Sequence, residues 1–386
     1  MALRVVNAKV LSICTLLLIF LATLAHFFSS RDGPHVAADA GSRLVSGNHQ
    51  VPYVPSNWRT RKAKPANATL DFQEILYISM PYRTDRQDAM SLLAAATGLK
   101  VTLIPGVDVS TMHPKAKPLL PFVDPAKAND SFLGVWRAHA NAWRHIIDHD
   151  VATALILEDD VDWDVHIKDI MGLWSFQLRY NNSLLSPSPS SSSSATDKSK
   201  NQECPYGCAW DELYMGQCGN TPNPDDRRHQ VYADPHSPAV STHTDPIVEE
   251  MTQHWNVSRD AAALRIISPT YGPLCAMGYA VTRLGAMRML YQIGGWRGFG
   301  MGVDNEIAFR TQEGRLRGWT LSPPCITAWR TGGARDSDND GDSAERVDDK
   351  GNAGGFTRGL KESARKAMER LLGETVDRRV EELLGR

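Results

Sequence analysis

The sequence lacks a surplus of charge of either sign. It has 42 Lys and Arg residues against 44 Asp and Glu residues, which gives a formal net charge of -2. Proteins that bind nucleic acid usually carry a basic surplus that neutralises phosphates, so we expect no nucleic-acid partner. The 386 residues suffice for one large domain or two ordinary ones.

Charged residues are also absent from residues 10–28. A helix of that length spans about one bilayer, whereas the apolar region of a cleaved signal peptide is shorter, about 7–15 residues. Arg4 and Lys9 precede this span, which favours a cytoplasmic N-terminus. We therefore predict a single-pass type II protein of the Golgi or endoplasmic reticulum with a luminal catalytic domain. Its predicted parts are a cytoplasmic tail (1–9), a transmembrane anchor (10–28) and a polar stem (29–70).

Cysteine is scarce, and one of the six residues, Cys14, lies in the predicted anchor. The group Cys204, Cys208 and Cys218 lacks a fourth ligand at zinc-finger spacing, so we expect disulfides in an oxidising lumen. Because five cysteines follow the anchor, at least one of them is left unpaired. Four glycosylation sequons agree with a luminal chain; they begin at Asn67, Asn129, Asn181 and Asn256.

Three segments depart from the pattern of a packed domain. A serine-rich stretch at about 185–203 has too little apolar surface to order itself and is predicted to be a disordered insertion. Residues 336–357 begin like an EF-hand loop, but Val347 stands where the twelfth-position Glu is needed, so we predict an acidic linker. Residues 358–386 carry apolar side chains at helical spacing and predict an amphipathic helix that docks on the domain.

Residues 71–335 alternate strand and helix signals and are predicted to form the catalytic domain, an α/β fold with a mixed sheet flanked by helices. The expected strands are at 74–80, 101–104, 154–157, 210–216 and 276–282. The expected helices begin near Ala89 and lie at 132–147, 285–293 and 307–310.

Three consecutive carboxylates, Glu158, Asp159 and Asp160, here called the acid motif, follow the apolar run that starts at Ala154. Ligands of open α/β sheets bind beyond the carboxyl ends of the strands. Adjacent carboxylates repel one another unless a cation compensates them, and divalent cations prefer oxygen ligands. The run therefore predicts a metal site beside a bound phosphate, with a solvated acidic turn as the alternative.

Two arginines, Arg83 and Arg86, follow the first predicted strand, where they either grip a phosphate or form a charged turn. A membrane-anchored α/β domain with acids at a strand end fits a nucleotide-sugar transferase of GT-A-like (Rossmann-like) architecture. In that chemistry a divalent metal neutralises the departing diphosphate, and a carboxylate removes the proton of the acceptor hydroxyl. Asp304 and Glu306, on a glycine-flanked segment that we expect to be a movable loop, are the candidate bases.

The sequence resembles glycosyltransferase family 25, which includes lipopolysaccharide and procollagen galactosyltransferases. The ordered segments that carry the resemblance are 77–86, Gly134 with His139 and Trp143, 156–160, 278–280 with 285–286, and 304–306. The resemblance implies a GT-A-type fold, an inverting transfer from a UDP-sugar and dependence on Mn²⁺. It implies that Glu158, Asp159 and Asp160 hold the metal and that Tyr77, Arg83, Arg86 and His139 contact the donor.

Galactose is the donor sugar expected from the family, and the acceptor is a glycan, glycoprotein or glycolipid. Two departures from the family pattern concern the donor: Tyr82 stands where a second arginine is frequent, and Ala138 replaces a common serine. Two other functions remain open at this stage. One is a non-catalytic scaffold of the secretory pathway. The other is a metal-dependent phosphoesterase, for which His145, His149 and His166 are near the acids in sequence.

Overall fold

The computed structural model describes residues 63–120, 130–180, 203–330 and 356–373. The predicted tail and anchor, most of the stem, the serine-rich insertion up to residue 202 and the acidic linker up to residue 355 lie outside these ranges. All described residues belong to one compact unit, which lies within Pro52–Arg386. No helix within the described ranges is long and apolar enough to cross a membrane.

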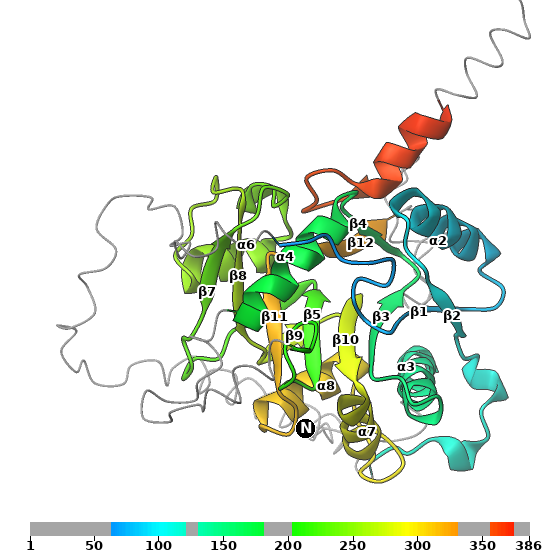
Figure 1. The fold of residues 1–386 in the computed structure, drawn as a ribbon. Helices are drawn as coiled ribbons and strands as arrows, with labels where there is room; N and C mark the ends of the chain where they lie inside the picture. Colours follow the sequence, from blue (N-terminus) through cyan, green and yellow to red (C-terminus); the bar gives the residue numbers. More distant parts are fainter. Residues whose placement is uncertain (1–62, 121–129, 181–202, 331–355, 374–386) are drawn as a thin grey trace, which may run out of the picture. The chain divides into compact units, whose positions relative to one another are not determined.

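A mixed sheet of eight strands forms the centre of this unit (Figure 1). The strands are β1 (Glu74–Ser79), β2 (Thr102–Pro105), β3 (Thr153–Glu158), β5 (Glu212–Gly216), β7 (Gln230–Ala233), β8 (Leu264–Pro269), β10 (Gly278–Thr282) and β11 (Gly318–Ser322). Their spatial order is β2-β1-β3-β10-β5-β11-β8-β7. Strands β1, β2 and β3 run parallel, and β10 lies antiparallel between β3 and β5. The expected mixed α/β fold is thereby confirmed.

Helices cover both faces of the sheet (Figure 1). The helices are α2 (Thr84–Thr97) and α4 (Ile167–Tyr180) on one face, and α3 (Asp130–Asp148), α7 (Arg283–Gln292) and α8 (Val303–Gln312) on the other. In β3, Leu155 and Leu157 pack with α2 and α4, while Ala154 and Ile156 pack with α3, α7 and α8. Because both faces are buried, β3 reads as a continuous apolar run without alternation.

Smaller elements surround the main sheet. A three-stranded sheet contains β13 (Phe356–Thr357), β12 (Ile326–Arg330) and β4 (Val161–Trp163), and a two-stranded sheet contains β6 (Gly219–Thr221) and β9 (Gly272–Leu274). Short helical turns are η2 (Val109–Thr111), η3 (Pro114–Ala116), η4 (Val240–Thr242), α6 (Asp245–Glu249) and the π-helical η5 (Glu250–His254). Strand β4 follows the acid motif directly, so the three-stranded sheet fixes where the chain goes after Asp160.

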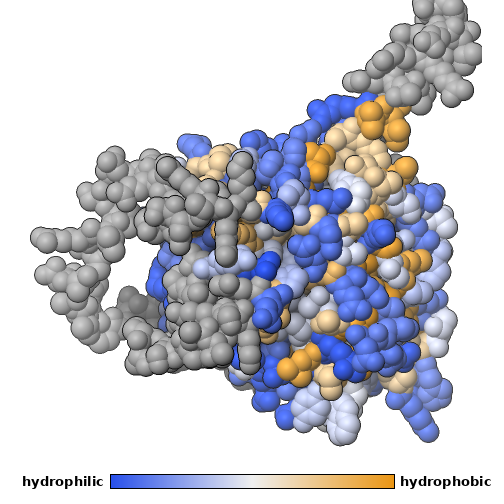
Figure 2. All heavy atoms as spheres, viewed as in Figure 1, coloured by the Kyte–Doolittle hydropathy of each residue, from blue (hydrophilic) through white to orange (hydrophobic). Residues whose placement is uncertain are grey.

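Residues 356–373, here called the C-terminal segment, are attached to β4. Buried Asp162 accepts hydrogen bonds from Ser363 Oγ (2.5 Å) and the Arg365 N–H (3.3 Å), and Arg365 Nε donates to the Val161 carbonyl (3.0 Å). The helix expected at 358–386 begins only at residue 364, because the chain bends over residues 358–362 and Ser363 makes a β-bridge with Asp164; residues 374–386 lie outside the described ranges. Its far end exposes Leu371 and Leu372, and hydrophobic spheres gather there in Figure 2.

Two other boundaries differ from the sequence prediction. Helix α2 begins at Thr84 rather than near Ala89. Helix α8 begins at Val303, so Asp304 and Glu306 lie in its first turn and the predicted movable loop is wrong at these residues. Acidic side chains in a first turn interact favourably with the positive end of the helix dipole, which explains why the helix extends through them.

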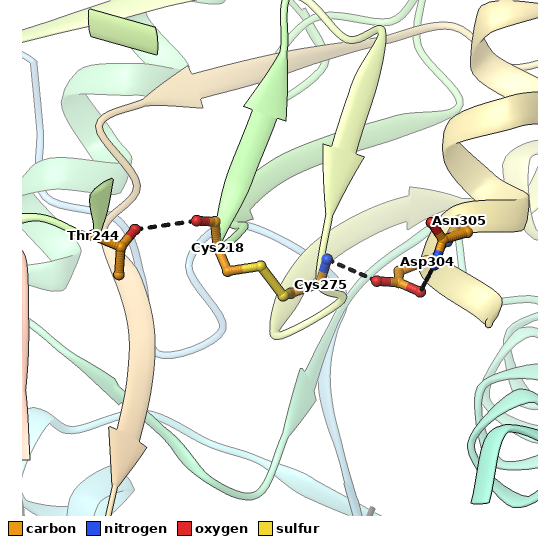
Figure 3. The surroundings of a disulfide bond; sticks show 5 residues. All are labelled: Cys218, Thr244, Cys275, Asp304 and Asn305. Atoms are coloured by element: carbon orange, nitrogen blue, oxygen red, sulfur yellow. Dashed lines mark hydrogen bonds between the residues drawn. A yellow bond between two sulfur atoms is a disulfide. The ribbon is translucent and has the colours of Figure 1, made fainter. Parts of the chain in front are cut away.

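The cysteines form two disulfides, Cys204–Cys208 and Cys218–Cys275, and the second is drawn in Figure 3. Cys325 is free and buried among the core side chains. The expectation of disulfides with an unpaired cysteine is confirmed for the described part of the chain.

Candidate functional site

A cavity of about 430 Å³ opens where β1 and β3 end. The remaining walls come from the loop after β2 (106–110) and from α3. A side chain at Gly134 of α3 would come within 2.9 Å of the Val107 carbonyl, so this glycine allows the loop to approach the helix. The cavity wall contains five of the residues predicted from the sequence: Arg86, His139, Glu158, Asp159 and Asp160.

The acid motif pairs with an arginine in the cavity wall. Arg86 Nη1 lies 2.5 Å from Asp159 Oδ1 and 3.5 Å from Asp160 Oδ2. Burial and the neighbouring Glu158 carboxylate raise the pKa of Asp160 to about 7, although Arg86 acts in the opposite direction. The negative charge of the motif is therefore only partly compensated by the protein itself, as expected for a site that receives a cation.

His139 on α3 connects the cavity to the core. Its Nδ1 lies 2.9 Å from the Tyr279 hydroxyl, which also accepts a hydrogen bond from Trp143 Nε1 (2.9 Å). Its Nε2 lies 3.8 Å from Glu158 Oε1. When the Tyr279 hydroxyl donates its hydrogen bond to Nδ1, the N–H of the neutral ring is at Nε2, which faces Glu158. His139 is thus both a satisfied buried histidine and part of the cavity wall.

Tyr77 and Arg83, two further residues expected at the donor, do not line the cavity as the structure describes it. Tyr77 is buried; burial first, and then the Asp159 carboxylate, raise the pKa of its phenol. Arg83 forms a bidentate pair with Asp85, in which Nε–Oδ1 and Nη2–Oδ2 are both 2.9 Å.

Asp304 reaches the same edge of the sheet from α8 (Figure 3). Its Oδ2 accepts the Cys275 N–H (3.0 Å), and its Oδ1 accepts the Asn305 N–H (2.9 Å). Two residues after Cys275, the Met277 carbonyl accepts the Glu158 N–H (3.1 Å). The segment 275–277 thereby links Asp304 to the acid motif.

Glu306 is held elsewhere. It is buried, its Oε1 accepts the Gly300 N–H (2.7 Å), and its Oε2 pairs with Arg310 Nη2 (2.9 Å). Both oxygens are thus engaged by the loop before α8 and by α8 itself. The structure separates the two candidate bases, because Asp304 contacts the segment beside the acid motif and Glu306 does not.

The acid motif also has the ligand chemistry of the expected divalent metal. Asp159 and Asp160 converge on the point now taken by Arg86 Nη1, and carboxylate oxygens are the donors that Mn²⁺ and Mg²⁺ prefer. Glu158 turns toward His139 instead. Within the described ranges, the three carboxylates do not all lie within 4.8 Å of one another. The residues therefore fit a cation held mainly by Asp159 and Asp160, with room for oxygens of a bound diphosphate.

A second cavity of about 300 Å³ is lined by Met277, whose carbonyl accepts the Glu158 N–H, so it lies near the acid motif without being lined by it. Its lining includes the disulfide Cys218–Cys275, Met277 and Arg330. The positive charge of Arg330 opposes the rise in the pKa of Asp160, and the Trp329 N–H donates to the Asp160 carbonyl (2.7 Å). Asp160 lines the first cavity, and Arg330 of the second cavity acts on it electrostatically.

Sequence reasoning missed the contributions that come from distant segments: the loop 106–110, Arg330, and the attachment of Arg365 to the strand after the acid motif. These residues stand in no recognisable pattern, so only the fold reveals them. The two departures from the family pattern, Tyr82 and Ala138, both line the first cavity.

The histidines that kept a phosphoesterase open do not line this cavity as the structure describes it. His145 pairs with Glu74 (Nε2–Oε2 2.9 Å) at the start of β1, the opposite edge of the sheet. His149 follows α3, stacked on His145, and His166 follows β4. These three histidines therefore do not join the carboxylates and Arg86 in the wall of the cavity.

Comparison of the chain with models of protein families gives no match, and comparison with curated proteins gives none. The resemblance seen in the ordered sequence segments therefore stays a prediction. The geometry of the cavity is the independent basis on which a function is proposed.

Proposed function

We propose that the chain is a membrane-anchored, inverting glycosyltransferase that moves a hexose from a UDP-sugar, galactose first among the candidates, to a hydroxyl of a glycan, glycoprotein or glycolipid. The observation that carries this proposal is the cavity at the ends of β1 and β3, in whose wall Arg86 meets Asp159 and Asp160. A GT-A-type fold is part of the proposal, supported by the parallel strands β1 to β3 beside antiparallel β10.

The donor's nucleoside diphosphate would occupy the first cavity. Its volume of about 430 Å³ lies in the ordinary range for small-molecule sites, roughly 300–1,000 Å³. Arg86 supplies a guanidinium for the diphosphate, and Asp159 and Asp160 would hold the divalent cation. Such a cation, when bound, neutralises the charge that develops on the leaving diphosphate.

The acceptor would enter from the second cavity, whose lining includes Cys275. Asp304 lines neither cavity as the structure describes them but accepts the Cys275 N–H, and from that position it would act as general base. Its carboxylate takes the proton of the acceptor hydroxyl while that oxygen bonds to the anomeric carbon. The bond from that carbon to the diphosphate oxygen breaks, and UDP leaves with the electron pair. One displacement of this kind inverts the anomeric configuration.

The cellular setting belongs to the same proposal. Residues 10–28 would anchor the protein in the membrane of the Golgi or endoplasmic reticulum, with the catalytic domain in the lumen. The two disulfides support an oxidising compartment, because cytosolic proteins rarely keep such bonds.

The test is to incubate the purified protein with a panel of UDP- and GDP-sugars, with and without Mn²⁺, and to measure release of nucleoside diphosphate. We expect Mn²⁺-dependent release of UDP from one sugar nucleotide. Binding of a sugar nucleotide without turnover would favour the scaffold, and hydrolysis of a phosphate ester without any sugar donor would favour the phosphoesterase. Either result contradicts the proposal.

A further inference from the structure

A second group of metal-ligating side chains lies away from both cavities. Asp164, His166 and His236 each offer a donor atom, and these atoms all lie within 4.8 Å of one another. The two imidazole rings stack with centroids 4.2 Å apart. The three residues line a separate cavity whose opposite wall is the C-terminal segment. They come from the end of β4, the start of α4 and the turn after β7.

Hydrogen bonds in the core hold two of these residues in place. Asp164 is buried; its Oδ1 accepts the His166 N–H (2.9 Å) and its Oδ2 accepts the Glu362 N–H (2.8 Å). Each of these oxygens keeps a second lone pair. The backbone N–H of His236 donates to Asp234 Oδ1 (2.9 Å). Asp234 is itself held by a buried ion pair with Arg265 (2.6 Å), which stabilises the turn after β7. The donors are thus presented by rigid backbone.

Carboxylates face both ring nitrogens of His166. Glu362 Oε2 lies 3.8 Å from Nε2, and Asp169 Oδ2 lies 3.6 Å from Nδ1. An imidazole that binds a metal through one nitrogen usually donates its other N–H to a carboxylate or carbonyl. If Nε2 of His166 binds the metal, the N–H at Nδ1 faces Asp169, and Glu362 lies beside the binding nitrogen. Glu362 is not among the three residues whose donor atoms already lie within 4.8 Å of one another, so its side chain must turn to become a further ligand.

We propose that Asp164, His166 and His236, with Glu362 as the fourth ligand, bind a Zn²⁺-class cation. Two imidazoles with carboxylates suit zinc and its neighbours, whereas the all-carboxylate motif at Glu158–Asp160 suits harder cations. Tetrahedral zinc with ligands at about 2.1 Å brings donors to about 3.4 Å of one another. The present donors lie within 4.8 Å of one another, and rotation of the exposed His166 side chain would shorten these distances to that separation. Rotation of the exposed Glu362 side chain would bring in the fourth ligand.

The cation would join three parts of the chain: the strand after the acid motif, the turn after β7, and the C-terminal segment. Lys361 already reaches that turn, because its Nζ donates to the Pro235 carbonyl (2.6 Å). This site stands independently of glycosyl transfer, and its test measures binding of the metal itself.

The experiment titrates the full chain, first stripped with a chelator, with Zn²⁺ by calorimetry and records the melting temperature. We expect the variant His166→Gln/His236→Gln to bind one Zn²⁺ fewer per chain than wild type and to lose the metal-dependent rise in Tm. Co²⁺ in place of Zn²⁺ should give the visible absorption of a tetrahedral site in wild type but not in the variant.

The matched control is His145→Gln/His149→Gln, because this other stacked pair has the same centroid separation, 4.2 Å. Glu74 contacts His145, but these three residues do not bring their donor atoms within 4.8 Å of one another. It should keep the wild-type stoichiometry. Glu362→Gln, an exposed single change, should weaken Zn²⁺ binding without altering the Tm of the metal-free protein. Equal Zn²⁺ stoichiometry in wild type and the His166→Gln/His236→Gln variant, or no Zn²⁺ binding by wild type, would overturn the proposal.

Discussion

The positive charge of Arg86 partly balances the negative charge of the acid motif. Burial lowers the pKa of its guanidinium, but the carboxylates of Asp160 and Asp159 raise it more, so the pKa is raised overall and the side chain stays charged. A guanidinium shared between two carboxylates reduces the repulsion between them when no ligand is bound. The same group can then turn to an incoming diphosphate, because Arg presents five donors.

Removing one charge from this motif gives a direct prediction. Asp160→Asn should lower kcat/KM by about 100-fold or more, by analogy with loss of one electrostatic contact to a transition state. The fold should persist because the size of the side chain hardly changes. Steady-state kinetics across a Mn²⁺ titration measure the effect. Asp148→Asn, an exposed carboxylate beside Arg144, is the control and should leave the rate unchanged. Full activity of Asp160→Asn would exclude its role.

The two acids of α8 should behave differently. Asp304→Asn should lower kcat more than it weakens donor binding, as expected for a general base. Glu306→Gln should instead lower the free energy of unfolding, by about 1–3 kcal/mol, because it disturbs a buried pair with Arg310. Comparing kcat, donor Kd and denaturant unfolding for both variants separates the roles. A stable Glu306→Gln protein with impaired turnover would reverse the assignment.

At the scale of elements, strands β1, β3 and β10 could be predicted because their apolar runs are bounded by polar residues. The start of α8 could not, since glycines and acids before it resemble a loop in sequence. Within the site, the position of the acid motif at a strand end could be predicted because it directly follows an apolar run. Arg86 lies in the first turn of α2, and its contact with the motif depends on the fold. The approach of Tyr279 to His139 depends on β10 packing beneath α3, a contact between residues 140 apart in sequence.

The disulfide Cys218–Cys275 connects stability with the position of Asp304. It joins residues 57 apart in sequence, so its loss should cost about 4 kcal/mol by the loop-closure model. The variant Cys218→Ser/Cys275→Ser should also turn over more slowly, because the Cys275 N–H holds the Asp304 carboxylate. Chemical denaturation and kinetics measure both effects.

The matched variant is Cys204→Ser/Cys208→Ser. That bond spans only 4 residues, so the same model gives a smaller loss, about 2 kcal/mol, and no effect on turnover is expected. Equal losses of turnover in both variants would show that Asp304 is not positioned through Cys275.

At the scale of the whole molecule, buried carboxylates make stability depend on pH. Glu212 lies at the start of β5, at the edge of the sheet opposite the acid motif, and burial raises its pKa from 4.5 to about 8, although a hydrogen bond from Thr311 (2.7 Å) acts against this. The folded state therefore binds this proton more tightly than the unfolded state does. Its contribution to stability is full below about pH 4.5 and is lost as the pH rises to about 8.

We therefore expect the wild-type melting temperature to fall as the pH rises through this window, and the fall to be shallower in Glu212→Gln, whose amide does not titrate. Thermal unfolding at a series of pH values from 4.5 to 8 measures both slopes. Parallel curves for the two proteins would mean that Glu212 does not titrate in this window.

The attachment of the C-terminal segment also has a consequence for how the chain is made. Arg365, which donates to the Val161 carbonyl, is synthesised 204 residues after Val161. Ser363, which donates to buried Asp162, is synthesised 201 residues after Asp162. Until then the strand that follows the acid motif lacks these partners. The nascent chain therefore completes this side of its site late in translation, and products that stop before residue 363 carry the acid motif without the bonds that secure it.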